Sequence, residues 1–288
     1  MAERRLGEVF DEIAEDYDEV RQGYPAEIVD IAIGRGQLVP GARALEVGCG
    51  TGKLTEALVA RGLLVDAVDP GPRMIALARK RTGDADYVTF HVGRFEEVTL
   101  PDEAFEAVFS ATAFHWLDAR VSWRKVASHL KPGGLLALLT HTSVPHDESR
   151  EVDEGFRALL LQYAPAAAWQ RPREIDTILT GARERSGNVS GAWDWVMGEG
   201  RHDLASEEAA ALFDEVDITA HVTEVELTAD ELISHFRTTS LYFQIDPDDR
   251  EAFEVADRRR IEEGGGTVRF FSATVLMTAM RSRFLQQE

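Results

Sequence analysis

Three glycines in a short segment are the residues in this sequence best suited to hold a ligand. Gly48, Gly50 and Gly52 follow the apolar run Ala44-Leu45-Glu46-Val47. Glycine lets a backbone turn tightly and approach a bound molecule without a side-chain clash. A dinucleotide loop would need a glycine where Lys53 stands, and the spacing of a phosphate loop is also missing. The pattern G-x-G-x-G therefore predicts a nucleoside-like ligand bound without a phosphate loop.

Two acidic residues accompany the glycine loop. Glu46 lies in the run before it, and Asp69 ends the next apolar run, residues 65–69. An acid at the end of the second strand of a doubly wound sheet accepts hydrogen bonds from the hydroxyls of a ribose. An aspartate at this position could instead cap the turn at Pro70-Gly71. Its place at the carboxyl end of a strand favours the ribose.

Alternating apolar patterns predict the elements that position these residues. Strands that alternate with helices need crossover connections, which gives a mostly parallel, doubly wound α/β sheet with helices on both faces. We expect seven strands, at 44–47, 64–68, 88–92, 107–110, 135–140, 217–227 and 268–277, and helices near 9–20, 28–32, 54–61, 73–81, 121–130 and 232–239. Thr228 and Glu231 have the spacing of a capping box before the last of these helices.

The same patterns divide the chain into four parts. Residues 1–40 are expected to form N-terminal helices, and residues 41–140 the core that holds the glycine loop. Residues 141–216 show helical patterns without strand alternation and are interpreted as a helical cap insert. Residues 217–288 would complete the sheet.

Composition narrows the range of functions. The 288 residues include 31 Lys and Arg against 51 Asp and Glu, a formal net charge of −20. Such a surface repels polyanions, which argues against nucleic acid and anionic membranes as partners. Cys49 is the only cysteine, so no intrachain disulfide or cysteine-based metal cluster can form. No secretory signal or spanning apolar run is found, and we expect a cytoplasmic enzyme.

These motifs resemble class I S-adenosylmethionine (SAM) methyltransferases of the small-molecule branch, which includes the trans-aconitate methyltransferase-like proteins. The likeness covers residues 9 to 140 and includes 45–54, Asp69, 92–96, 110–117 and 130–134. It implies that the glycine loop lies against the methionine part of SAM, Asp69 holds the ribose, and residues 92–96 surround the adenine. Many members carry Asp where this chain has Arg94. The cofactor-binding residues implied or proposed are Tyr17, Arg21, Glu46, Gly48, Cys49, Gly50, Gly52, Asp69, Pro70, Met74, Arg94, Phe95, Ser110, Ala111 and His115.

Methyl transfer from a sulfonium is an in-line displacement, so the protein mainly aligns the acceptor and sometimes removes a proton. His115, after the fourth strand, is the candidate base, and the equal alternative is a structural hydrogen bond or a ring face packed on the substrate. His141, after the fifth strand, is the second candidate, although a structural role is favoured. Arg21 could pair with the cofactor carboxylate or, as is more usual for arginine, lie exposed to solvent. Tyr17 and Tyr24 could close over the cofactor or simply pack.

The acceptor pocket is the least determined part. Aromatic residues that could line it, or belong to an ordinary core, are Trp169, Trp193, Trp195, Phe236, Tyr242 and Phe243. Arginines that could face an acidic acceptor, or solvent, are Arg171, Arg173, Arg183 and Arg185.

The favoured function is therefore a SAM-dependent methyltransferase that produces S-adenosylhomocysteine, acts on O, N or C of a small molecule and needs no metal. The main alternative is a non-catalytic SAM-binding protein of the same fold, for regulation or assembly. A nicotinamide oxidoreductase would need the other glycine spacing. A nucleic-acid amino-methylating enzyme would resemble a branch with Asn/Asp-Pro-Pro-aromatic after the fourth strand, where this chain has Ser110-Ala111-Thr112-Ala113-Phe114. The sequence leaves the oligomeric state open and allows a homodimer.

Overall fold

The computed structural model describes residues 9–83, 86–146, 150–165, 172–198 and 206–283. The chain divides into two compact units. The first unit comprises Met1–Gln22, Thr142–Glu174 and Val222–Ala273, and the second comprises Gly23–His141, Ile175–His221 and Thr274–Glu288. The glycine loop and Asp69 belong to the second unit.

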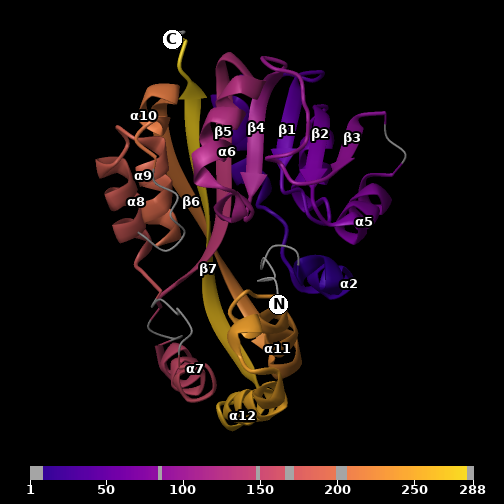
Figure 1. The fold of residues 1–288 in the computed structure, drawn as a ribbon. Helices are drawn as coiled ribbons and strands as arrows, with labels where there is room; N and C mark the ends of the chain where they lie inside the picture. Colours follow the sequence, from indigo (N-terminus) through magenta and orange to yellow (C-terminus); the bar gives the residue numbers. More distant parts are fainter. Residues whose placement is uncertain (1–8, 84–85, 147–149, 166–171, 199–205, 284–288) are drawn as a thin grey trace. The chain divides into compact units, whose positions relative to one another are not determined.

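A seven-stranded sheet runs in the order β3-β2-β1-β4-β5-β7-β6 (Figure 1). The pairs β1 with β2, β1 with β4, β2 with β3 and β4 with β5 are parallel. The predicted doubly wound, mostly parallel sheet is confirmed. The strands are β1 (Arg43–Val47), β2 (Leu64–Asp69), β3 (Val88–Val92), β4 (Phe105–Ala111), β5 (Leu130–Val144), β6 (Phe213–Thr228) and β7 (Thr267–Arg281).

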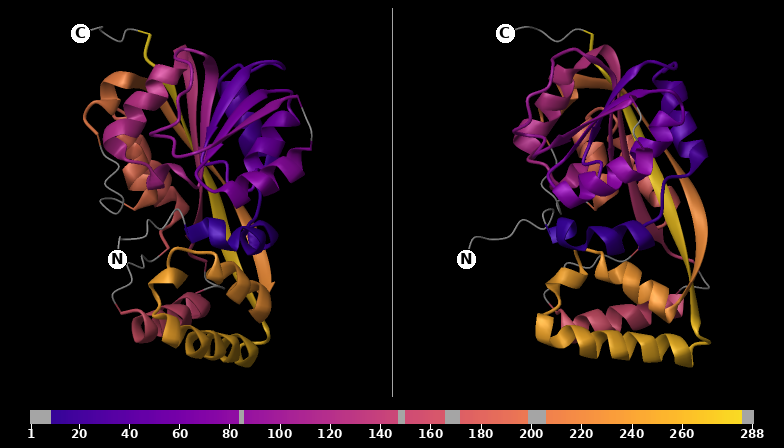
Figure 2. Two further views of the ribbon diagram at one scale, coloured as in Figure 1. Left: turned by 45° about the vertical axis from the view of Figure 1, so that its right-hand side comes forward. Right: turned by 90° about the vertical axis from the view of Figure 1, so that its right-hand side faces the viewer.

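Helices cover both faces of this sheet in the second unit (Figures 1 and 2). On one side, apolar residues of α3 (Ala26–Arg35) and α4 (Lys53–Val59) share a core with alternate residues of β1, β2, β4 and β5. Helix α5 (Pro72–Thr82), which follows β2, adds Ile75 to this core, whereas α6 (Ala119–His129) lies on the other side of the sheet (Figure 1). Because the inner strands are buried on both faces, they are continuously apolar rather than alternating.

The connection from β3 to β4 differs from the others because the described residues 93–104 contain no helix. Polar side chains lie across β1, β2 and β3 on one sheet face instead. Asp66 of β2 accepts a hydrogen bond from Arg43 of β1 at 3.0 Å and pairs with His91 of β3 at 2.9 Å. Such polar side chains suit a sheet face that is half exposed and has no covering helix in this connection.

The first unit is built from short helices and the ends of long strands. Its helical segments are η1 (Phe10–Ile13), α2 (Ala14–Val20), α7 (Arg150–Tyr163), α11 (Ala229–Arg237), η3 (Tyr242–Gln244), η4 (Pro247–Asp249) and α12 (Arg250–Glu263). The predicted capping box of α11 is confirmed, with Glu231 N donating to Thr228 Oγ1 at 3.3 Å and Thr228 N donating to Glu231 Oε2 at 2.8 Å. An aromatic core that includes Phe236 and Phe253 joins α7, α11 and α12.

The segment predicted as a cap, 141–216, contains helices α7, α8 (Ile175–Glu184), α9 (Val189–Met197) and α10 (Ala209–Leu212). The division between the two units falls inside it, after Glu174. Its role in covering a substrate stays a prediction.

Candidate functional site

The glycine loop joins β1 to α4 with all three glycines at positive φ: +73° at Gly48, +53° at Gly50 and +82° at Gly52. Gly48 N and Cys49 N both donate to Val68 O of β2, at 2.8 and 3.0 Å. The loop thus lies beside the end of β2. Its left-handed backbone explains why glycine is favoured at these positions.

The three glycines differ in what a side chain would meet. A Cβ at Gly48 would lie 2.3 Å from Cβ of Ala113, and one at Gly52 would lie 2.9 Å from Ala78. A Cβ at Gly50 would have no protein atom within 4 Å. Packing therefore requires Gly48 and Gly52, whereas Gly50 borders open space in which a ligand could approach the backbone.

Asp69 holds the loop and its own turn together. Its Oδ2 accepts from Gly50 N at 2.9 Å and its Oδ1 accepts from Gly71 N at 2.8 Å. The turn-capping interpretation is thus correct. A carboxylate has about four acceptor positions, so these bonds leave Asp69 able to accept ribose hydroxyls as well.

Glu46 lies under the loop with 1% of its surface exposed. Burial, more than the nearby charge of Asp69, raises the pKa of its carboxyl to about 8, against 4.5 in an unfolded chain. Thr55 Oγ1 of α4 donates to Glu46 Oε2 at 2.6 Å. Glu46 is thus mostly uncharged at neutral pH and ties β1 to the helix that follows the loop. Cys49 is buried too, which raises the pKa of its thiol and keeps it unreactive.

The end of β4 adds a second loop beside the first. Ser110 Oγ donates to Val47 O at 2.8 Å, which joins the ends of β4 and β1 next to Ala111. His115 follows in the short helix η2 (Phe114–Trp116), with its ring centroid 4.7 Å from that of Trp116. His115 is half-buried and follows a strand at the carboxyl edge of the sheet, which is where a candidate base is expected.

His141 of β5 contacts a neighbouring strand and the segment before α3. Its Nδ1 lies 3.1 Å from Thr274 Oγ1 of β7, and its ring stacks on Tyr24 with centroids 4.9 Å apart. These contacts fix the ring and support the structural role that the sequence favoured for it.

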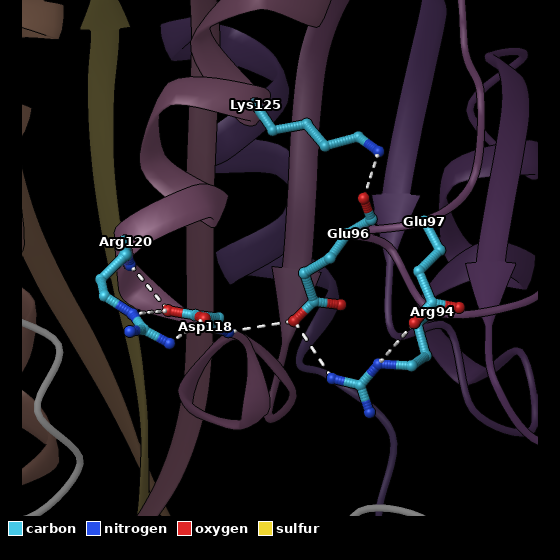
Figure 3. Close-up of polar contacts among 6 residues, drawn as sticks. All are labelled: Arg94, Glu96, Glu97, Asp118, Arg120 and Lys125. Carbon is cyan, nitrogen blue, oxygen red and sulfur yellow. Dashed lines mark hydrogen bonds and ion pairs between the residues drawn. The ribbon is translucent and has the colours of Figure 1, made fainter.

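The end of β3 carries a network of charged side chains (Figure 3). Arg94 pairs with Glu96 at 3.4 Å and with Glu97 at 3.6 Å. Glu96 Oε1 also accepts from Asp118 N at 3.0 Å, while Lys125 Nζ donates to Glu96 O at 3.1 Å. The loop after β3 is therefore tied to the loop after β4 and to α6.

The other predicted cofactor residues lie in different surroundings. The ring of Phe95 is 2% exposed and packs beneath Lys125 Nζ, and Met74 is buried in α5, whereas Pro70 is exposed. Tyr17 and Arg21 belong to the first unit, where Arg21 donates to Thr238 through Nε at 3.0 Å and Nη2 at 2.7 Å. Their contacts with a cofactor stay predictions.

Several predicted acceptor residues pack within their own units. Trp193 is fully buried, and Trp195 Nε1 donates to Ile178 O at 3.1 Å. Phe236 lies in the aromatic core of the first unit, with Tyr242 packed against it. The remaining candidates are Phe243, Arg173, Arg183 and Arg185. The ring of Phe243 lies 6.2 Å from that of Phe10. Arg183 donates to Ile218 O, and the guanidinium of Arg185 lies over the ring of Trp195. Trp169 and Arg171 lie outside the described residues.

Two residues that sequence reasoning missed are Thr55 and Thr112. The first is the partner of Glu46, and the second has a left-handed backbone at φ +55°. The nine-residue spacing of Glu46 and Thr55 matches no motif, so the sequence does not predict their hydrogen bond. A β-branched residue does not reveal a positive φ either, because it is among the residue types least suited to one.

The sheet order and the loops at its carboxyl edge define a class I methyltransferase fold. Residues 45–138 match the family model described as a methyltransferase domain, so the resemblance expected from the sequence is confirmed for this domain. An uncharacterised methyltransferase of Mycobacterium tuberculosis is 41% identical over 128 residues, which are 44% of this chain and 49% of the relative. The malonyl-(acyl-carrier protein) O-methyltransferase of Serratia marcescens is 29% identical over 136 residues, 47% of this chain and 52% of that protein. The chain spans about half the length of these curated relatives.

Solved structures agree on the fold over most of the chain. A putative type II methyltransferase from Anaeromyxobacter dehalogenans has a TM-score of 0.58 at 20% identity, covering 92% of this chain and 98% of that one. A SAM-dependent methyltransferase from Thiobacillus denitrificans, solved with S-adenosylhomocysteine, has a TM-score of 0.52 at 13% identity, covering 95% and 98%.

The described residues carry neither a membrane-spanning helix nor a cluster of metal ligands. None of the helices there has the length and apolar character needed to cross a bilayer. Within the same ranges, His, Cys, Asp and Glu side chains form no group of three or more suited to a metal ion.

Proposed function

We propose that this chain is a SAM-dependent methyltransferase that moves a methyl group to O, N or C of a small-molecule acceptor. The observation that carries the proposal is the open space at Gly50, in a left-handed glycine loop whose conformation Asp69 holds. The methyltransferase-domain match over residues 45–138 supports it.

The residues present fit this cofactor. Gly50 leaves room for a ligand against the backbone, and Thr51 Oγ1 is a buried hydroxyl without a hydrogen-bond partner in the described structure. Buried polar atoms normally find a partner, so an unsatisfied hydroxyl in a ligand loop suits a polar ligand group. Asp69 would hold the ribose, and Arg94 and Phe95 would lie toward the base.

SAM would supply an activated methyl group on a sulfonium centre, and the protein would orient and desolvate the acceptor. Well-ordered alignment alone can contribute about 7 kcal/mol or more, which exceeds the roughly 100- to 10,000-fold effect of a general base. We propose His115 as the group that takes a proton from the acceptor when one must be removed. His141, held by Thr274 and Tyr24, is the second candidate.

The net charge of −20 supports a small acceptor over a nucleic acid or an anionic membrane. We further propose that the protein acts in the cytoplasm and without a metal. The expected likeness to the trans-aconitate branch stays a prediction, and we propose carboxylic acids as a first set of acceptors to screen, because that branch and the malonyl group in the name of the Serratia relative both suggest them.

Calorimetry with S-adenosylhomocysteine tests the cofactor site directly. Gly50→Ala places a methyl group in the open space, so we expect at least tenfold weaker binding. Gly41→Ala is the matched control, because Gly41 also has a positive φ of +88° and no atom within 4 Å of an added Cβ, but it precedes β1 at its amino end. Equal weakening in both variants, or no binding by the wild type, would contradict the cofactor assignment.

Acceptor screening with SAM, with and without EDTA, then separates the enzyme from its alternative. Turnover that persists in EDTA supports a metal-independent methyltransferase. Tight S-adenosylhomocysteine binding with no methyl transfer to any acceptor would favour the non-catalytic SAM-binding protein.

A further inference from the structure

The loop between β4 and α6, residues 112–118, is held at both of its ends within the second unit. At its far end, Asp118 N donates to Glu96 Oε1 at 3.0 Å (Figure 3). At its near end, Thr112 N donates to Leu139 O of β5 at 2.8 Å. His115, the candidate base, lies between these two anchors.

Thr112 adopts a conformation that its side chain disfavours. Its φ is +55°, in the left-handed region where a β-branched residue is a genuine outlier. Such strain persists only where surrounding contacts over-determine it, and it is concentrated at functional sites. The contacts around Thr112 should therefore indicate which structural role the strained turn has.

Ala113, the residue after the left-handed turn at Thr112, contacts the glycine loop. Ala113 comes so close that a Cβ at Gly48 would lie 2.3 Å from its own Cβ. Phe114 is buried and packs on Trp123, with ring centroids 4.6 Å apart. The turn at Thr112 thus sets where Ala113 meets the backbone that lies beside the open space at Gly50.

Tyr24, from the segment before α3, adds a side-chain contact to this turn. Its hydroxyl is 3.1 Å from Thr112 Oγ1, and its ring stacks on His141 with an interplanar angle of 12°. A tyrosine held on its ring face by one residue can place its hydroxyl with little loss of freedom. It is well suited to hold Thr112 in the strained conformation.

We propose that Tyr24 is a positioning residue for the cofactor site: its hydroxyl holds Thr112 in the left-handed turn and thereby seats Ala113 against Gly48. The inference rests on the proposed function, because it assigns the effect to the affinity of the glycine loop for the cofactor. The ring of Tyr24 packs on His141 of β5, and its hydroxyl contacts Thr112, which follows β4. One side chain thus contacts both a residue of β5 and the turn that follows β4.

Calorimetry with S-adenosylhomocysteine on conservative variants tests this inference, with thermal unfolding used to confirm that each variant is folded. Tyr24→Phe removes only the hydroxyl and leaves the ring to stack on His141. Loss of one hydrogen bond should weaken binding about fivefold. Thr112→Val should weaken it equally, and the double variant should be no weaker than either single one, because both changes remove the same bond. Tyr87→Phe, at an exposed tyrosine, is the matched control.

A rescue separates positioning from simple packing. Asparagine tolerates the left-handed region, so Tyr24→Phe combined with Thr112→Asn should regain an affinity within twofold of the wild type. Unchanged affinity in Tyr24→Phe, or failure of this rescue, would overturn the inference while the wild type still binds. If the wild type does not bind S-adenosylhomocysteine, the proposed function fails, and the inference fails with it.

Discussion

Replacing Glu46 by glutamine should remove a pH dependence of stability that this buried carboxyl introduces. Burial raises its pKa to about 8 in the folded chain, against 4.5 when it is exposed. Between these two values the unfolded chain has released its proton while the folded chain keeps it. The folded state is therefore favoured fully at pH values below 4.5, and this contribution is lost as pH rises through about 8.

The size of the effect follows from linkage. One proton bound only in the folded state changes the free energy of unfolding by about 1.4 kcal/mol per pH unit. Over the interval from 4.5 to about 8 the change amounts to about 5 kcal/mol. This is a large fraction of the 5–15 kcal/mol by which a typical domain is stable.

Urea unfolding of the wild type and of Glu46→Gln at pH 5, 6, 7 and 8 measures this difference. Glutamine does not titrate and keeps an oxygen that can accept from Thr55 Oγ1. Its extra amide hydrogen adds a pH-independent cost of about 1–3 kcal/mol. The stability of the variant relative to the wild type should rise steadily with pH. A constant difference would show that the pKa of Glu46 is not raised in the folded chain, which would refute the reasoning.

The remaining predictions concern packing and a second titrating group. Gly52→Ala should lower stability by about 1–3 kcal/mol, because Gly52 has φ +82° and its added Cβ would lie 2.9 Å from Ala78. Gly34→Ala lies in α3, where no atom is near the added Cβ, and should instead raise stability by about 0.5–1 kcal/mol. Thermal unfolding compares the two variants, and equal changes in stability would contradict the packing argument. Burial lowers the pKa of His129 in the folded chain below its usual value of 6.5. As pH drops below about 6.5, His129 therefore binds a proton in the unfolded chain before it does so in the folded one, and the stability of the wild type should fall. His129→Asn, which keeps a donor for Pro101 O, should lack that component in acid unfolding curves, and identical curves would refute it.

Local patterns determined most of the fold. The apolar runs at 44–47 and 64–68 and the alternating run at 88–92 were sufficient to place β1, β2 and β3, because apolar residues recur in strands with a short period. The glycine spacing likewise indicated the turn between β1 and α4, since a left-handed backbone favours glycine at the positions where it occurs. Strand lengths were less visible: β5 was predicted at 135–140 and extends over Leu130–Val144, because pairing partners far along the chain decide where a strand ends.

The sequence by itself thus determined the parallel sheet, the glycine loop and the position of Asp69 at the end of a strand. The tertiary structure decided what those residues contact: Asp69 holds Gly50 and Gly71, and Glu46 is buried against Thr55 and becomes a weak acid. It also decided the strained turn at Thr112 and its contact with Tyr24, 88 residues earlier in the chain. Periodicity and turn preference act between near neighbours, whereas burial, pKa and long-range hydrogen bonds depend on residues that only the folded chain brings together.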